Sequence, residues 1–411
     1  MIPLLKIECI QTCFPYFCLM HEKFLQLAQQ YADDIIGWRR HIHAHPELSY
    51  QEFETAAFVQ ATLHSFGIST QTLANTGIIG CIEGKNPAKK LIALRADMDA
   101  LPIEEENDLP YRSTKKGIMH ACGHDVHTSC LLGAARILQE TRSEWEGTVK
   151  LIFQPGEEKN PGGASLLIKE GVLNPPTPQA IVALHVSTVL ETGKFSFRAG
   201  KVMASADEIY ITIKGKGGHA ASPHLAIDPI LISAHLITAL QQLISRHNDP
   251  FNPTVLSITS IQGGNTTNVI PDKVELMGTF RAMNEEWRYK AHQLIRQVIE
   301  QVASSMGAEA LLHIDIGYPC VHNDEKLHQQ VVPLAVQLAG EKNISETEVR
   351  MGAEDFGFYA QQIPGCFFRL GVMNRSLSIT HGVHTSRFQV DEAALAPGAA
   401  MMAWLGARIE P

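Results

Sequence analysis

The segment from Met119 to Thr128 holds the side chains with the clearest chemical potential in this sequence. It reads MHACGHDVHT and contains one thiol, three imidazoles and one carboxylate, with Cys122 and His124 separated by a single glycine. Gly123 can adopt backbone angles that other residues avoid, so both side chains can turn towards one point. A thiolate and an imidazole together suit zinc-like divalent ions. A core cysteine beside surface histidines would explain either residue alone, but the group as a whole predicts a metal site.

More ligand-type residues stand where short apolar runs end. The runs 91–96, 149–153 and 181–184 are predicted to be buried strands, and the residues at or just beyond their ends include Asp97, Asp99, Glu157, Glu158 and His185. Buried strands that alternate with helices are typical of a largely parallel sheet covered by helices. Ligands of such sheets bind beyond the carboxyl ends of the strands. Because the helix between the first two strands opens with Cys122 and His124, we expect all these groups to meet at one sheet edge.

The set of candidate ligands is too large, and too rich in carboxylate and imidazole, for a closed structural site of four ligands. The candidates are Cys122, His124, Glu158, His185 and His384, with Asp97 and Asp99 close by. Such a set fits a pair of ions that share ligands, which can activate water and hold a carbonyl oxygen. Hydrolysis there also needs an uncoordinated carboxylate to move a proton to the leaving nitrogen. The neighbours Glu157 and Glu158 can divide these roles, although an acidic loop that is merely solvated is the alternative.

The elements that must position these residues indicate two domains, as a length of 411 residues also suggests. Beyond about Ser205 the predicted order is strand, helix, strand, strand, helix, strand, which is the split arrangement of a ferredoxin-like unit. The ranges are 209–213, 227–245, 255–261, 274–280, 285–305 and 311–316. A strand over 367–372 and a helix over 391–409 then return to the first pattern. Helices over 22–44 and 51–66 and a strand over 77–83 begin that pattern.

The predicted fold class is therefore α/β: a mostly parallel sheet flanked by helices, with an inserted ferredoxin-like α+β domain. We expect an N-terminal extension over residues 1–20, a discontinuous catalytic domain over 21–204 and 317–411, and the insert over 205–316.

Composition excludes several classes of partner. The formal net charge of −9 argues against nucleic acid or an anionic membrane surface, which would require a basic face. Eight cysteines in a chain of this length do not form a disulfide scaffold, so reduced thiols in the cytoplasm are expected. The first twenty residues are apolar, but Lys6, Glu8 and Pro15 interrupt them and no small-residue cleavage site follows. We expect a cytoplasmic protein that binds neither nucleic acid nor membranes.

Four segments resemble the N-acyl-amino-acid amidohydrolases, a group that includes hippurate hydrolases, auxin-conjugate hydrolases and N-acetyldiaminopimelate deacetylases. This group is a branch of the aminoacylase and carboxypeptidase-like metallohydrolases. The segments are MHACGHD at 119–125, QPGEE at 154–158, ALH at 183–185 and HTSRF at 384–388. The resemblance runs from about residue 24 to the C-terminus and leaves residues 1–20 outside.

The resemblance implies a role for each residue of the site. Glu157 would be the general base, and the metal ligands would be Cys122, His124, Glu158, His185 and His384. They would hold one or two divalent ions per subunit, manganese or zinc first and cobalt or nickel as further options. The wider superfamily usually has a histidine where this chain has Asp97, and an aspartate ligand where it has Cys-Gly-His. Both departures are shared by the branch named above.

The insert resembles the lid or dimerisation domain of the same family. In the segment 218–223, His219 would stabilise the oxyanion, often in the partner subunit's site, and Asn268 and Arg281 would grip the substrate's carboxylate. Arginine presents paired donors to a carboxylate, and histidine can donate to a developing oxyanion. We therefore expect a homodimer or higher homo-oligomer through this domain. A water-exposed loop histidine and a surface ion pair are the alternatives for His219 and Arg281.

The sequence thus predicts a metal-dependent amidohydrolase that cleaves small N-acyl-amino acids, hippurate-like, N-acetyl or indole-acetyl, to a carboxylic acid and an amino acid. A dipeptidase or exopeptidase of the same fold would share the site chemistry and differ only in the acyl pocket. An N-acetyldiaminopimelate deacetylase is a further alternative. A non-catalytic binding module should have lost ligands or the base, and a structural zinc protein would not need Glu157.

Overall fold

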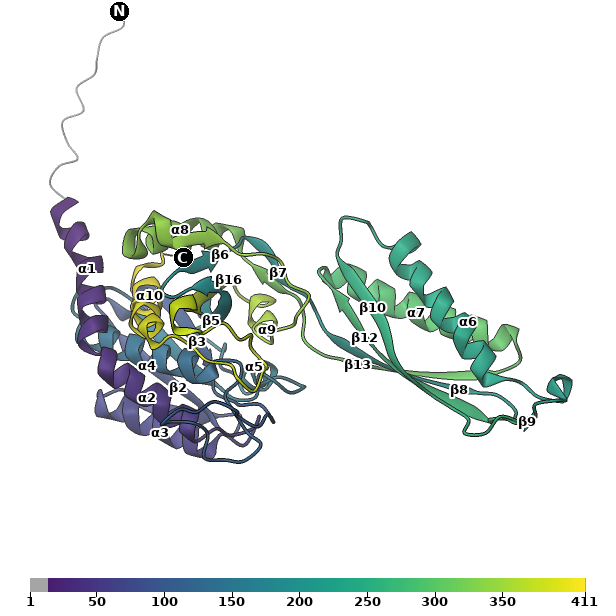
Figure 1. Cartoon of the computed structure of the whole chain (residues 1–411). Coiled ribbons are helices and arrows are strands. Elements are labelled where there is room, and N and C mark those ends of the chain that lie inside the picture. The colour runs from purple at the N-terminus through teal and green to yellow at the C-terminus, as the bar shows by residue number, and fades with distance from the viewer. Residues whose placement is uncertain (1–13, 411) are drawn as a thin grey trace, which may run out of the picture. The chain divides into compact units, whose positions relative to one another are not determined.

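The computed structural model describes residues 14–410, which form two compact units (Figure 1). Unit 1 contains the chain up to Gly200 together with 323–348 and the residues from Tyr359 onward, and unit 2 contains 201–322 and 349–358. Most of the expected N-terminal extension lies outside the described residues. Its last part, from Phe14, belongs to the first helix, α1 (Phe14–Gln30).

Unit 1 is organised around a sheet of eight strands in the order β1-β2-β4-β3-β5-β16-β6-β15. The strands are β1 Thr70–Leu73, β2 Gly77–Glu83, β3 Leu91–Asp97, β4 Thr148–Gln154, β5 Ala180–Glu191, β6 Phe195–Phe197, β15 Ile344–Glu346 and β16 Gly365–Met373. Its centre, from β4 through β3 and β5 to β16, is parallel, whereas β2 pairs antiparallel with β4. β3 and β16 are buried along their whole lengths, as parallel strands enclosed on both faces should be.

Helices surround this sheet. They are α1, α2 Ala32–Ala44, α3 Phe53–Ser65, α4 His124–Glu140, α5 Gly163–Lys169, α8 Glu325–Ala339 and α10 Leu395–Arg408, and the residues of the short α9 Gly357–Ala360 are divided between the two units. The long, almost wholly apolar α10 packs against α4, and both contact the central strands. The single helix expected over 22–44 is two helices, α1 and α2, which meet at Tyr31. Within residues 14–410, no helix is long and apolar enough to cross a membrane.

The carboxyl ends of the central strands form one edge, and α4 begins beside them. Asp97 at the end of β3 pairs in register with Gln154 at the end of β4. Gly123 precedes α4 with a φ of 88°, and a Cβ there would lie 2.6 Å from a methyl group of Val186. Glycine is therefore needed for both the backbone angle and the close approach to β5.

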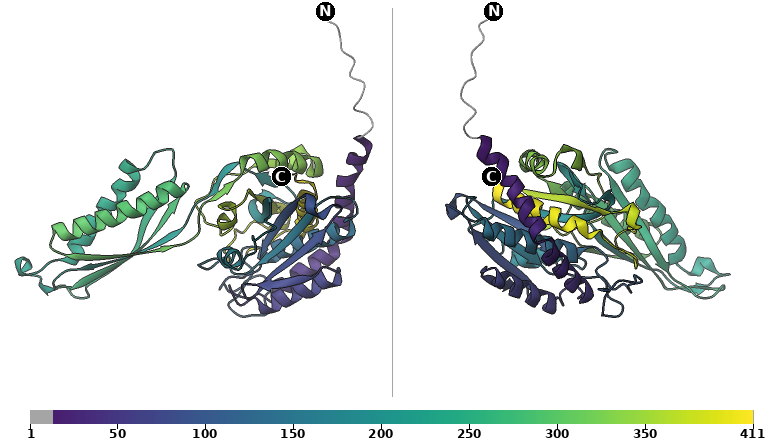
Figure 2. Two further views of the ribbon diagram at one scale, coloured as in Figure 1. Left: turned by 180° about the vertical axis from the view of Figure 1, so that it is seen from behind. Right: turned by 60° about the vertical axis from the view of Figure 1, so that its left-hand side comes forward.

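Unit 2 has a four-stranded antiparallel sheet in the order β10-β12-β8-β13. Its elements are β8 Asp207–Lys214, α6 Pro229–Gln242, β10 Thr254–Gln262, β12 Lys273–Ala282, α7 Glu285–Ser305 and β13 Glu309–Ile316. Both helices cover one face of the sheet (Figure 2), and Ile209, Ile211 and Ile213 of β8 are buried in the core of this unit. Numbered along the chain, the strand order is 2-3-1-4, which confirms the ferredoxin-like arrangement.

Two short ladders complete the description. β9 (Gly218–His219) pairs with β11 (Val269–Ile270), and β7 (Gly200–Met203) pairs with β14 (Val321–Asn323). The fold class expected from the sequence is confirmed: a mostly parallel sheet with helices and a separate small antiparallel domain.

Candidate metal centre and active site

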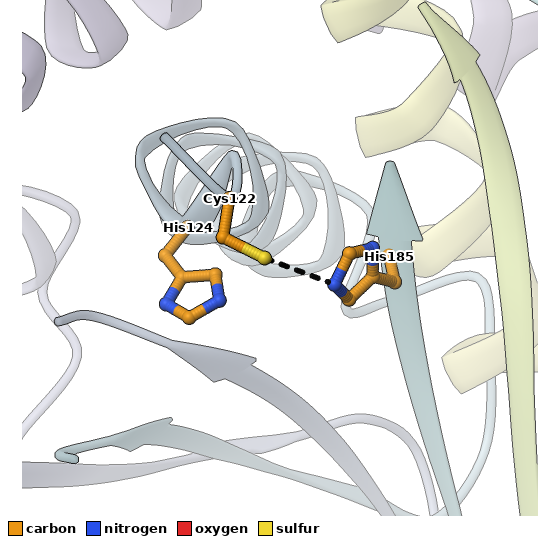
Figure 3. A group of neighbouring side chains, drawn as sticks. All are labelled: Cys122, His124 and His185. Atoms are coloured by element: carbon orange, nitrogen blue, oxygen red, sulfur yellow. Dashed lines mark hydrogen bonds between the residues drawn. The ribbon is translucent and has the colours of Figure 1, made fainter. Parts of the chain in front are cut away.

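Three predicted ligands of unit 1 face one another. Cys122 and His124 come from the start of α4 and His185 from β5, and all three are buried. Figure 3 shows the Cys122 thiol directed at the His185 ring, and its Sγ lies 3.6 Å from Nε2 of that ring. The ligand atoms of the three residues all lie within 4.8 Å of one another. The three side chains therefore lie together as the strand-end argument predicted, but His185 lies within β5, which continues to Glu191, and not at a strand end.

A second group of predicted ligands shares the same thiol. The ligand atoms of Cys122, Glu158 and His384 also lie within 4.8 Å of one another, with Nε2 of His384 3.1 Å from Oε1 of Glu158. Hydrogen bonds with Cys122 and Glu158 raise the pKa of His384 to about 10. His384 has a φ of 62°, an uncommon angle for a non-glycine residue, and its N–H donates to Ala121 at 2.7 Å. Two groups of candidate ligands therefore share one thiol.

The side chains at this position fit a metal ion on their own chemistry. Nε2 of His124 is buried and has no hydrogen-bond partner among residues 14–410. Burial, and then the charge of Glu158, raises the pKa of the Cys122 thiol. Burying ligand atoms that face one another without a partner costs free energy unless a cation binds them. A thiolate is likewise stabilised by a positive charge beside it. Sulfur, imidazole nitrogen and carboxylate oxygen are together a donor set for zinc or a similar divalent ion.

The two buried histidines are oriented by bonds at their other nitrogen. Nδ1 of His185 donates to the carbonyl of Val186 at 2.8 Å. Nδ1 of His124 lies 2.9 Å from the carbonyl oxygen of Asp99. Both rings therefore present Nε2 to the site, as ligating histidines usually do. Burial alone would lower the pKa of His124, but the charges of Asp97 and Cys122 outweigh it and raise that pKa well above the usual value.

The glutamate doublet is held in place by Asp99. The N–H groups of Glu157 and Glu158 donate to the two carboxylate oxygens of Asp99 at 2.9 and 3.0 Å, and Ser49 donates to it at 2.6 Å. One carboxylate oxygen from each glutamate lies 4.0 Å from Nε2 of His124. Since backbone and side-chain donors engage the Asp99 carboxylate, its role here is to fix the doublet. Both glutamates can then reach the same point from adjacent positions.

Sequence reasoning assigned no role to three buried polar residues next to this centre: Arg95, Gln154 and His127. Arg95 stands in an otherwise apolar strand, and His127 follows His124 after three residues on α4. Burying a charged residue in a strand costs free energy unless the charge is paired. Arg95 in an apolar run therefore could have predicted a buried acidic partner.

The three remaining predicted site residues belong to unit 2. His219 is exposed on β9, where its Nδ1 accepts a bond from the N–H of Ala221 at 3.1 Å. Asn268 is also exposed, and its carbonyl accepts from the N–H of Ala220 at 3.0 Å, so these two segments are neighbours. Arg281 on β12 is partly buried and donates through Nε to Thr279 at 3.0 Å. Burial lowers the pKa of Arg281, and no carboxylate among the described residues forms an ion pair with it.

Known proteins with similar sequences and folds cover nearly the whole chain. Residues 93–406 match peptidase family M20/M25/M40. The chain is 40% identical over 399 residues to the IAA-amino acid hydrolase ILR1-like 5 of Arabidopsis thaliana, covering 94% of this chain and 89% of that protein. It is 41% identical over 306 residues to an N-acyl-L-amino acid amidohydrolase of Geobacillus stearothermophilus, covering 74% and 82% respectively.

A solved structure agrees with these sequence relatives. The crystal structure of a Bacillus subtilis protein described as a dinuclear metal binding peptidase from the M20 family matches with a TM-score of 0.81 and 36% identity. That match covers 92% of this chain and 98% of the other.

Proposed function

This chain belongs to peptidase family M20/M25/M40, and we propose that it is a metal-dependent amidohydrolase that cleaves N-acyl-amino acids to a carboxylic acid and an amino acid. The observation that carries the proposal is the thiol of Cys122, which belongs to two groups of candidate ligands. The carboxylate of Glu157 stands beside them, 4.0 Å from Nε2 of His124. The relatives that share about two fifths of its residues and act on acylated amino acids support this substrate class.

We assign five residues as ligands of one or two divalent ions, with manganese and zinc as the first candidates. They are Cys122, His124, Glu158, His185 and His384. A bound divalent ion of this kind polarises a substrate carbonyl and lowers the pKa of a water molecule.

The chain's own residues would carry the proton and hold the substrate. The Glu157 carboxylate takes one proton from the attacking water and gives it to the amine nitrogen as the C–N bond breaks. His219 donates a hydrogen bond to the oxyanion that forms on the former carbonyl oxygen. Arg281 offers paired N–H donors to the carboxylate of the amino acid, with Asn268 as a further donor. The motif matches support these three roles in unit 2.

Metal removal tests the chemistry. Chelation should abolish hydrolysis, and manganese, zinc or cobalt added back should restore it in part, measured by release of the free amino acid. The ligands must lose their protons to bind a metal ion, so metal affinity should also fall in mild acid. Full activity in protein shown to be metal-free by elemental analysis would contradict the proposal.

An exopeptidase is the second candidate, because the chain is also 39% identical over 392 residues to thermostable carboxypeptidase 1 of Saccharolobus solfataricus. The two functions are separated by a substrate panel on the metal-reconstituted protein. Hippurate, N-acetyl-amino acids, indole-acetyl conjugates and N-acetyldiaminopimelate form one arm, and dipeptides with a free amino terminus form the other. We expect hydrolysis in the first arm. Turnover of dipeptides alone would establish the second candidate, and turnover of N-acetyldiaminopimelate alone would identify a deacetylase.

We further propose that the protein is cytoplasmic and forms a homodimer or higher oligomer through unit 2. Sedimentation of the purified protein checks the second point, since a monomer at working concentration would contradict it.

A further inference from the structure

We propose that Asp97 and His127 are positioning residues that fix the metal ligands through a buried chain of hydrogen bonds, and are not ligands themselves. The proposal deepens the metal centre proposed above and rests on it.

Both carboxylate oxygens of Asp97 have hydrogen-bond partners. Its Oδ2 accepts from Nη1 of Arg95 at 2.6 Å, and its Oδ1 lies 2.6 Å from Nδ1 of His127. All three side chains are buried. Arg95 also neutralises the charge of Asp97, so the pair adds no net charge to the ligand set. A carboxylate that is engaged at both oxygens and balanced by an arginine has little left to offer a metal ion.

The bonds of His127 define which nitrogen carries its proton. The backbone N–H of Val186 donates to Nε2 of His127 at 3.0 Å. A nitrogen that accepts this bond has no hydrogen, so the proton of the neutral ring is on Nδ1 and is donated to Asp97. Both nitrogens are therefore occupied. His127 could bind a metal ion only by giving up one of two buried hydrogen bonds.

The chain of bonds ends on a ligand. Val186 follows His185, and its carbonyl accepts the Nδ1–H bond of His185 at 2.8 Å. The peptide groups on both sides of Val186 are thus held, its N–H by His127 and its carbonyl by the ligand ring. His127 consequently sets where β5 presents Nε2 of His185, which faces the Cys122 thiol at 3.6 Å.

At its other end the same chain reaches the glutamate doublet. Nε of Arg95 donates to the side chain of Gln154 at 3.0 Å, and Gln154 ends β4 three residues before Glu157. The relay Gln154–Arg95–Asp97–His127–Val186 therefore joins β4, β3, α4 and β5. These are the elements from which, or just beyond which, Glu158, His124 and His185 project. It is a second support, separate from the bonds of Asp99.

A competing interpretation is available in the same residues. The ligand atoms of Asp97, His124 and His127 also lie within 4.8 Å of one another, so they could in principle hold an ion. The two interpretations differ in stoichiometry. Loss of a ligand removes a bound ion, whereas loss of a support weakens binding and leaves the number of ions unchanged, typically by roughly 10–100-fold in affinity.

Two substitutions of His127 separate its two bonds. His127→Asn places an amide donor near the Nδ1 position, so it can keep the bond to Asp97 and loses the acceptor for Val186. His127→Gln places an amide oxygen near the Nε2 position, so it can keep the Val186 bond and loses the donor to Asp97. The metal-free proteins are titrated with cobalt(II), and the thiolate-to-cobalt absorption band reports coordination by Cys122 without any substrate.

We expect His127→Asn to bind cobalt roughly 10–100-fold more weakly than the wild type with unchanged stoichiometry, and His127→Gln to retain most of the affinity. Thr141→Val is the matched control. Thr141 is buried at the far end of α4 and donates only to Ile137, so its affinity for cobalt should stay at the wild-type value. Fewer ions bound by both His127 variants, or wild-type affinity in both, would overturn the proposal.

Asp97→Asn keeps the test decisive if His127→Asn does not fold. Asparagine retains an acceptor for His127 but loses the charge that holds Arg95, so cobalt affinity should fall in the same direction by a smaller factor. Wild-type affinity in this variant would overturn the relay. A wild-type protein that binds cobalt without a thiolate band would instead contradict the proposed metal centre.

Discussion

The two units hold their candidate site residues in opposite ways. In unit 1 the five candidate ligands and Glu157 lie on β5, just beyond β4 or beside α4, and most of them are buried. In unit 2, His219 and Asn268 are exposed on short segments and Arg281 is partly buried on β12. The candidate ligands of unit 1 are held by backbone register and by hydrogen bonds to Asp99 and His127. The three residues of unit 2 have few hydrogen bonds that fix their side chains. Their chemistry therefore depends on the groups that a bound substrate presents to them.

This difference teaches where substitutions should act. Changes in unit 1 should alter metal content or proton transfer, since the site is assembled within that unit. Changes in the three residues of unit 2 should leave bound metal unchanged and affect only turnover or substrate affinity. The predictions below test that division.

The largest effect is expected from the glutamate doublet. Glu157→Gln removes the proton carrier and should lower kcat by roughly 10²–10⁴-fold with the metal still bound. Glu158→Gln removes an anionic ligand, so bound metal should fall and activity should return in part at high metal concentration. Metal content and turnover of both variants are measured side by side. If Glu157→Gln loses the metal and Glu158→Gln keeps it, the two roles are reversed.

The next effect concerns His219 in unit 2. His219→Ala removes a donor to the oxyanion and should lower kcat by roughly 10²–10³-fold, with metal content equal to the wild type. If His219 serves a partner subunit, mixing His219→Ala protein with Glu157→Ala protein should restore activity as hybrid dimers form. No recovery after confirmed subunit exchange would place His219 in its own subunit's site or outside catalysis. Loss of metal from His219→Ala would contradict the division between the units.

The contrast between the units also explains what sequence could and could not predict. Asp97 ends β3, Glu157 follows β4 and His185 lies on β5. The apolar runs in the sequence predicted these three strands, and the rule for parallel sheets then predicted that the three residues meet at one edge. The relay through His127 was not predictable, because it depends on which nitrogen of one ring meets the backbone of β5. Roles for His219 and Arg281 came only from the family resemblance. The sequence alone could not distinguish them from a solvent-exposed histidine and an arginine in a surface ion pair.

A smaller effect is expected at Arg281. Arg281→Ala removes a charge-assisted contact to the substrate's carboxylate, which should raise KM by roughly 10–100-fold with little change in kcat. Substrates in which an amide replaces that carboxylate should be affected much less by the same change. Arg246→Ala, at an exposed position of the same unit, is the control and should leave KM unchanged. Equal loss on acid and amide substrates would remove Arg281 from substrate recognition.

The smallest expected effect is on how the folding stability of each unit depends on pH. In unit 2, buried Asp207 accepts from Nε of Arg288 at 2.9 Å and lies 2.8 Å from Nε2 of His292. Burial alone would raise the pKa of Asp207, but these partners lower it below its usual value. Folding is then favoured by the ionised form. This contribution is complete above the pKa of the unfolded chain, about 3.9, and is lost as the pH falls below it.

Unit 1 contains the opposite case in Glu52. Burial, and then the charge of Asp99, raises the pKa of Glu52 to about 7. The folded protein therefore binds this proton more tightly than the unfolded chain does, so the contribution of Glu52 is most favourable in acid and declines as the pH rises through 7. Its carboxylate accepts bonds from Gly156 at 2.8 Å and Thr76 at 2.7 Å.

Glu52→Gln keeps an acceptor for Gly156 and cannot ionise, so it should remove this pH dependence. Between pH 5 and 8 the free energy of unfolding of unit 1 should fall by roughly 2 kcal/mol more in the wild type than in the variant, as expected for a carboxyl with so large a shift. Hydrogen exchange in chelator-treated protein resolves the two units separately, and Asp207→Asn serves as the matched change in unit 2. That variant should alter exchange in unit 2 and lose its acid sensitivity there, without affecting the slope near neutral pH. An identical slope in wild type and Glu52→Gln would show that another group of unit 1 binds the proton.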